Sequence, residues 1–233
     1  RLVASSLEDA HASVRGAATK ALIAITVAAS TKVDEVPDAV LEAAARLEHD
    51  RMDVRKAAIE TLWGVIGCTE SIQSSLQGRL GHTIPDGIAQ TWVLEEITRR
   101  CRHPSIGTRR MAMQAFARMG CCNPIVLAAI RRCLRDDAWQ VRLEAVQTLE
   151  GLCPDKAANS RALWSEAADY LQPLIEPESC VRLAVVHLLG HAGRDGDEEA
   201  LACLVNAGMD PDLDVQEAAA KEIARAKSDA QKK

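Results

Sequence analysis

The chain has 233 residues, 48% of them hydrophobic and 26% charged, and its formal net charge is −5; this balance is ordinary for a folded chain. Aromatic residues make up only 3%, which argues against a β-sheet, where aromatic and β-branched residues dominate. No stretch approaches the ~18 uncharged apolar residues of a membrane-spanning helix, so we expect no membrane span.

From residue 13 onward, one sequence motif occurs six times along the chain. Each copy has a short polar turn, an apolar residue or Thr, then Arg or Gln, and then small and branched apolar residues with helical spacing. The copies occupy residues 13–22, 53–62, 107–116, 140–149, 180–189 and 214–223. Repetition at intervals of roughly 33 to 54 residues is typical of a stacked helical solenoid. We therefore predict an all-α fold, an α-solenoid of about six antiparallel helix pairs.

Each copy is predicted to be the second helix of a pair, with one apolar stripe on one face. We number the residue before the Arg or Gln as position 0. Position 0 holds Val14, Val54, Thr108, Val141, Val181 and Val215. Position +4 holds Ala18, Ala58, Ala112, Ala145, Val185 and Ala219, and position +8 holds Leu22, Leu62, Phe116, Leu149, Leu189 and Ile223. The small residues at +4 are expected to let neighbouring helices approach closely.

The first helix of each pair is predicted upstream of its copy, after Asp, Glu or Pro cap signals. These helices are expected at 36–48, 86–102, 123–135, 160–175 and 197–208, with residues 1–7 as a truncated first one. The repeats then cover approximately 1–29, 36–66, 86–120, 123–153, 160–193 and 197–226, as a single array over 1–233 with a polar tail at 227–233. Because Arg1 enters in mid-repeat, we expect the array to begin before it.

The interval between Val54 and Thr108 is longer than the others, and the surplus lies in 67–85, GCTESIQSSLQGRLGHTIP. This segment is predicted to be an inter-repeat insertion. Such an insertion either projects from one edge of the array, where it can contact a partner, or is a plain linker.

The order of Asp, then Val-Arg, then Ala and Leu in the copies resembles the HEAT repeat of the armadillo-like helical superfamily, in the variety found in phycobilisome lyases. In that family the Arg typically pairs with an acid of an adjacent turn, forming a ladder between repeats. The resemblance therefore implies an inter-repeat ladder of Arg15, Arg55, Arg109, Arg142 and Arg182. Gln216 replaces the last Arg, which suggests a C-terminal cap.

Charge is distributed unevenly along the chain. Residues 99–142 hold ten arginines against Asp136 and Asp137, a segment charge of +8. Aligning the repeats stacks Arg99 over Arg132 and Arg102 over Arg135, so these four arginines are predicted to form a cationic edge. The edge could bind an acidic partner, because Arg suits bidentate contacts to carboxylate or phosphate. The alternative is that these residues cap helix C-termini or pair with neighbouring carboxylates.

Residues that could carry catalysis or hold metal do not form a recognisable pattern. The eight cysteines contain no CxxC pair and are expected to be free thiols, which favours a reducing intracellular compartment or organelle interior. No histidine is followed by Glu, so the iron-binding His-Glu dipeptides of HEAT-like hydroxylases are absent from the sequence. His187 and His191 share a helix face but have no evident third ligand. We expect no catalytic residues, no metal and no cofactor.

A noncatalytic scaffold is the function that this pattern favours. The chain is expected to bind a protein partner with an acidic surface, as a peripheral subunit or assembly factor of a larger complex. Two alternatives stay open. The Arg-rich edge could bind a nucleic-acid backbone or a phospho-ligand, or the chain could handle a tetrapyrrole as the bilin lyases do.

Overall fold

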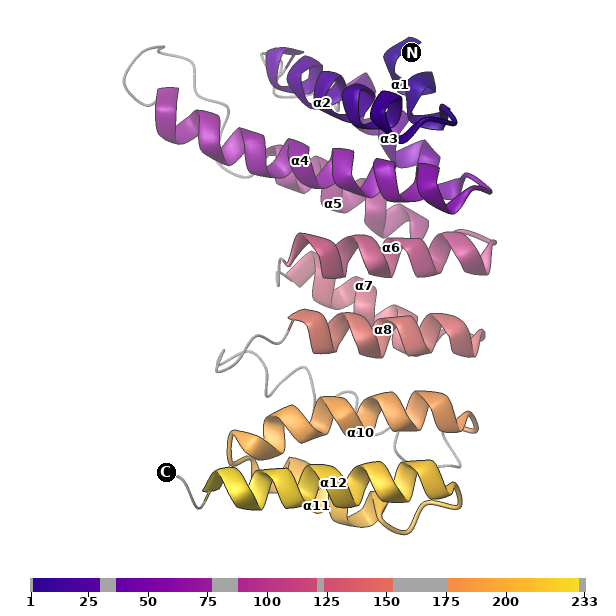
Figure 1. Ribbon diagram of the computed structural model, residues 1–233, viewed down its shortest axis with the longest axis vertical. Coiled ribbons are helices and arrows are strands. Elements are labelled where there is room, and N and C mark those ends of the chain that lie inside the picture. The colour runs from indigo at the N-terminus through magenta and orange to yellow at the C-terminus, as the bar shows by residue number, and fades with distance from the viewer. Residues whose placement is uncertain (1, 30–36, 77–87, 121–123, 153–175, 231–233) are drawn as a thin grey trace. The chain divides into compact units, whose positions relative to one another are not determined.

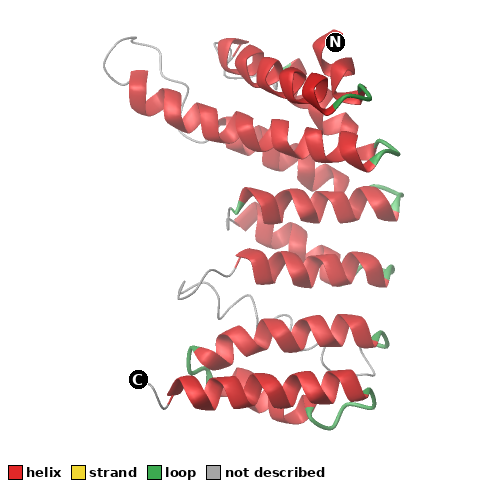
Figure 2. Cartoon of the chain, in the orientation of Figure 1, coloured by secondary structure: helices red, strands yellow, loops and turns green. Residues whose placement is uncertain are grey.

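The computed structural model describes residues 2–29, 37–76, 88–120, 124–152 and 176–230. Every regular element within these ranges is a helix, as predicted (Figure 2). The chain divides into two compact units, Arg1–Met119 and Gly120–Lys233, called here the N-terminal unit and the C-terminal unit. The boundary falls between the third and fourth predicted repeats. Each unit therefore contains three of them, and their union in one array stays a prediction.

The N-terminal unit consists of three stacked helix pairs (Figure 1). The pairs are α1 (Leu2–Ser5) and 3-10 helix η1 (Ser6–Glu8) with α2 (Ala12–Ala29), α3 (Asp38–Ala45) and η2 (Arg46–Glu48) with α4 (Met52–Leu76), and α5 (Ile88–Arg100) with α6 (Ile106–Met119). Second helices pack against second helices, α2 on α4 and α4 on α6, and α3 packs on α5. This is the packing that the predicted pairs require.

The C-terminal unit contains α7 (Pro124–Leu134), α8 (Trp139–Leu152), α10 (Ser179–Arg194), α11 (Glu198–Ala207) and α12 (Leu213–Ala230). α7 packs on α8, α11 packs on both α10 and α12, and the second helices α8, α10 and α12 pack in that order. The first helix predicted at 160–175 lies outside the described residues. All six predicted second helices are confirmed.

The predicted apolar stripe forms the core. Five of the six side chains at position 0 expose at most 4% of their surface, as do all six at +4 and five at +8. The two exceptions are Val14, which is 38% exposed, and Ile223, which is half-buried. They belong to the first and the last of the described repeats. Burial of this stripe is what drives the helices together.

The predicted insertion at 67–85 is partly helical. α4 continues through Leu76, so residues 67–76 extend the second helix of the second repeat. Residues 77–85 lie outside the described part of the chain, and a role for the insertion in contacting a partner stays a prediction. Within the described ranges, none of the helices combines the length and apolar character that crossing a membrane requires.

Candidate functional site

The arginine at position +1 closes the turn between the two helices of its own repeat. Its Nη1 donates to the carbonyl oxygens of the residues six and five before it, at 2.6 to 3.0 Å. The five residues are Arg15, Arg55, Arg109, Arg142 and Arg182. Gln216 keeps one such bond, from Nε2 to the carbonyl of Asp210 at 2.6 Å. Sequence reasoning missed this role, although the constant spacing between turn and Arg was a signal for it.

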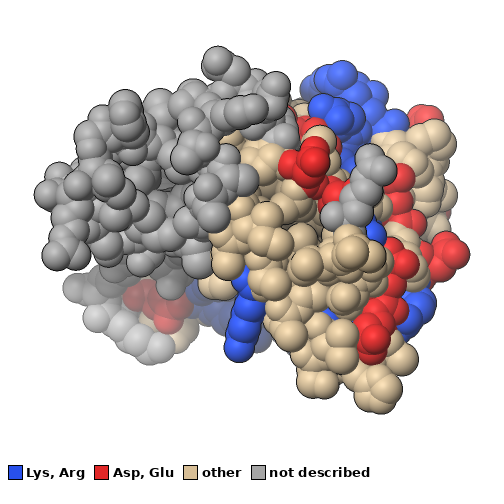
Figure 3. Space-filling view, turned by 90° about the horizontal axis from the view of Figure 1, so that it is seen from above, with Lys and Arg blue, Asp and Glu red and all other residues tan. Residues whose placement is uncertain are grey.

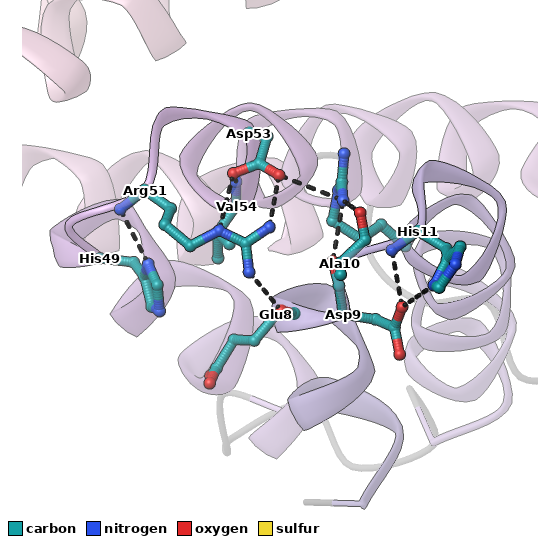
Figure 4. Close-up of polar contacts among 9 residues, drawn as sticks. Glu8, Asp9, Ala10, His11, His49, Arg51, Asp53 and Val54 are labelled. Atoms are coloured by element: carbon teal, nitrogen blue, oxygen red, sulfur yellow. Dashed lines mark hydrogen bonds and ion pairs between the residues drawn. The ribbon is translucent and has the colours of Figure 1, made fainter.

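A second side chain caps the same turn from position −5. In each of the six repeats it accepts the backbone N–H two residues on, at 2.7 to 3.1 Å. The residues are Asp9, His49, His103, Asp136, Glu176 and Asp210. The two histidines accept through Nδ1, which places the ring proton of the neutral imidazole on Nε2. Figure 4 shows the Asp9 and His49 caps.

In the C-terminal unit the +1 arginines also bind acids of the next repeat. Arg142 donates from Nε and Nη2 to Glu176, at 2.6 and 2.8 Å, and Arg182 binds Asp210 in the same way at 2.8 and 2.9 Å. The Glu176 and Asp210 side chains expose at most 1%. The hydrogen bond to each acid raises the pKa of its arginine. These two-bond pairs join consecutive turns.

The N-terminal unit uses a more exposed acid for this purpose. Arg15 Nη1 lies 3.1 Å from Asp53, whose side chain is 38% exposed. Asp53 also accepts from Arg51 at 2.7 Å, and Arg51 donates to the carbonyl of Glu8 at 2.8 Å (Figure 4). The hydrogen bond from Arg51 is the main reason that the pKa of Asp53 is lowered. For Arg55, the described residues supply no carboxylate at all.

A further inter-repeat contact links position −6 of one repeat to position −8 of the next. Glu8 binds Arg46 at 3.1 Å, and Glu48 binds Arg100 at 3.3 Å. Sequence reasoning missed this pairing. In the third and fourth repeats, position −6 holds Arg102 and Arg135 instead of Glu. Because arginine replaces glutamate at this position, neither residue can supply the carboxylate of this contact.

The four arginines of the predicted cationic edge differ in their contacts. Arg99, 70% exposed, binds the buried Glu96 at 2.8 Å. Arg102, Arg132 and Arg135 are exposed and form no ion pair with another described residue. Arg99 and Arg102 belong to the N-terminal unit and the other two to the C-terminal unit, so the stacking of the pairs stays a prediction. The face drawn in Figure 3 carries both basic and acidic side chains, with one group of basic atoms at its upper edge.

A buried carboxylate joins the second helices of the last two repeats. Glu222 of α12 is 2% exposed and binds Arg194, Arg225 at 2.6 Å and His187 at 3.6 Å. A Cβ placed on Gly190 of α10 would collide with its Cγ, Cδ and Oε2. Gly190 therefore makes the room in which the carboxylate lies.

We expect Gly190→Ala to lower the free energy of unfolding by about 1–3 kcal/mol, because the added methyl group overpacks the site and displaces a buried charge. Urea unfolding followed by circular dichroism measures the change. Gly151→Ala in α8 is the matched control, since nothing lies within 4 Å of its Cβ position, and there the better helix former is expected to stabilise. Equal shifts in the two variants would contradict the assignment.

Groups that could hold a metal ion do not occur among the described residues. His187 lies beside Glu222, and His191 lies 3.5 Å from Glu150. Of the cysteines, Cys101 and Cys133 are buried free thiols, and Cys180 and Cys203 are half-buried free thiols. Burial raises the pKa of the Cys180 thiol.

Comparison with known proteins shows a shared fold. No protein-family model and no curated protein matches the chain. Among solved structures, a TOG domain array of Crescerin, described as regulating microtubules in the primary cilium, superposes with a TM-score of 0.53 at 14% identity and covers 97% of this chain and 89% of its own. A designed armadillo repeat protein in complex with the peptide (KR)4 gives 0.51 at 16% identity, covering 97% and 98%. An engineered protein gives 0.52 at 17%, covering 97% and 98%.

Proposed function

We propose that this chain, a helical repeat protein of the HEAT and armadillo-like fold, is a noncatalytic scaffold that binds an acidic surface of a partner protein. Stacked helix pairs present broad, preformed surfaces, and binding then requires little ordering of the scaffold. In a larger complex such a chain would serve as a peripheral subunit or an assembly factor.

The observation that carries the proposal is the set of exposed arginines that the fold does not use. Most arginines of the turns clamp carbonyls or bind acids, whereas Arg102, Arg132 and Arg135 have no such contact among the described residues. Each lies in the last turn of a first helix or just after it, and these helices are anchored by buried apolar residues. An exposed guanidinium on a rigid element can bind a carboxylate through two parallel hydrogen bonds.

The charge of the chain supports a protein partner over nucleic acid. The net charge of −5 opposes a long polyanion, while a short acidic segment can contact a few arginines and avoid the acidic repeats. The designed armadillo protein with a similar fold is in complex with the basic peptide (KR)4. We propose that the present chain uses the same kind of fold with the opposite sign of charge at its contact.

Exchanging Arg102, Arg132 and Arg135 for Glu tests this proposal. We expect the triple variant to lose most of its affinity for a fluorescein-labelled oligoglutamate peptide, measured by anisotropy at low ionic strength, because attraction becomes repulsion. The same variant should recover fewer protein partners from the native source, read by mass spectrometry with and without nuclease.

The matched control changes Lys20, Lys56 and Lys227 to Glu, three exposed residues of second helices with the same change in charge. This control is expected to bind almost as the wild type does. Equal losses in both variants would show an effect of net charge alone, and recovery that depends on nuclease treatment would favour a nucleic-acid partner.

A further inference from the structure

We propose that residues 101–107, called here the third turn, form with Arg55 of α4 the place where the chain accepts a carboxylate of its partner protein. This inference rests on the proposed function and deepens it by naming a site. The third turn joins α5 to α6, and α6 packs against both α4 and η2.

The third turn differs from the other turns of the array in its charge. Its sequence, Cys-Arg-His-Pro-Ser-Ile-Gly, contains no acid. Each of the other five turns between paired helices contains at least two acids, among them Glu8 and Asp9, Asp50 and Asp53, Asp136 and Asp137, Glu176 and Glu178, and Asp210 and Asp212. The absence of acid is therefore a property of one turn and not of the repeat.

Arg55 is the +1 arginine that precedes this turn. Its Nη1 clamps the carbonyls of His49 and Asp50, both at 2.6 Å, as its counterparts do. Its Nε is buried and has no hydrogen-bond partner in the described part of the structure, and Nη2 contacts only the sulfur of Met52 at 3.6 Å. The atoms with which Arg142 and Arg182 each hold a carboxylate thus hold none here.

The repeats show where such a carboxylate would come from within the chain. It comes from position −5 of the next repeat in Glu176 and Asp210, or from position −1 in Asp53. In the third repeat these positions hold His103 and Gly107. Because both acids are missing, Arg55 retains the capacity to bind a carboxylate that another molecule supplies.

Arg102 adds a second cation to the same turn. It occupies position −6, where Glu8 and Glu48 stand in the first two repeats, and its side chain is exposed. Met52, 49% exposed, covers Nη2 of Arg55 with a flexible thioether that can move aside. A carboxylate is the group that fits, since the chain itself places carboxylates against this arginine position in three other repeats.

The variant Gly107→Asp supplies the missing carboxylate from within. Its side chain would take the place that Asp53 has in the second residue of α4, and only Ser105 Oγ, at 3.6 Å, lies near the new Cβ. An acid in the first turn of a helix is itself favourable. We expect a higher melting temperature and about tenfold weaker binding of the labelled oligoglutamate peptide, the loss of one charge-assisted contact.

Gly107→Asn is the matched control, with the same shape and no charge, and it is expected to bind the peptide as the wild type does. Wild-type affinity in Gly107→Asp, or an equal loss in Gly107→Asn, would overturn the site while leaving the proposed function intact. Failure of the wild type to bind oligoglutamate would overturn the proposed function and this site with it. Tighter binding of labelled oligothymidylate than of the peptide would assign the site to nucleic acid instead.

Discussion

Replacing Asp210 with alanine is expected to lower the free energy of unfolding of the C-terminal unit by about 3–5 kcal/mol. The Asp210 and Arg182 side chains are 1% and 4% exposed and share two hydrogen bonds. Removing the carboxylate leaves the guanidinium buried with no opposite charge against its Nε and Nη2, which costs more than the pair contributes net. The turn also loses the oxygen that accepts the N–H of Asp212 at 2.9 Å.

Asp210→Asn separates the two losses. Asparagine keeps an oxygen for the N–H of Asp212 but removes the charge that faces Arg182. Urea unfolding should therefore rank the wild type above Asp210→Asn and the latter above Asp210→Ala. If Asp210→Ala matched the wild type, the ion pair between the last two repeats would have no part in their stability.

The same pair predicts how stability depends on pH. Burial alone would raise the pKa of Asp210, but the hydrogen bonds from Arg182 and from the backbone of Asp212, with the charge of Arg182, hold it below its ordinary value of 3.8. Because the folded-state pKa is the lower one, the stabilisation is complete above 3.8 and is lost as the pH falls from there through the folded-state pKa. Asp210→Asn should lack this part of the acid unfolding curve.

Truncating Phe116 to alanine is expected to destabilise the N-terminal unit by about 3–5 kcal/mol. Phe116 is the one phenylalanine of the chain, stands at position +8 of α6 and is 0% exposed. The other repeats carry Leu or Ile at position +8, so the third repeat fills this part of the core with a larger side chain. The alanine variant loses the buried apolar surface and leaves a cavity that the rigid helices close only in part.

Phe116→Leu tests whether the volume or the position matters. Leucine restores the residue that four other repeats use at +8, and the expected loss is smaller than that of the alanine variant. The measurement is again urea unfolding. Equal losses for Leu and Ala would mean that the ring itself, and not the filled volume, holds the layer together.

The fold was predictable because its signals are local. The six copies of the sequence motif predicted the second helices. The residues at positions 0, +4 and +8 proved to form the core, with the exceptions of Val14 and Ile223. Cap residues and spacing also predicted the first helices that the structure describes, whereas the one predicted at 160–175 lies outside the described residues. The extension of α4 through Leu76 was not expected, since Gly67 and the Ser-rich segment that follows are poor helix formers.

The candidate site was predictable only in part. Sequence reasoning named Arg102, Arg132 and Arg135 as candidates, and it also named Arg99, which binds the buried Glu96. It did not distinguish Arg55 from the other ladder arginines. The distinction depends on the fact that acids contact the arginine from positions −5 and −1 of the next repeat. The spacing of the sequence motif does not reveal this.

By itself, the sequence determined the helical class, the pairing of the helices and the residues that are buried, because helical period, capping and apolar burial depend on neighbours along the chain. Only the tertiary structure decided which arginines hold the repeats together and which remain exposed. An ion pair exists where two side chains from different repeats come within about 4 Å, and that distance depends on how one turn packs against the next. The third turn, which contains no acid, matters for the same reason: the helix that follows it, α6, packs against α4, which carries Arg55.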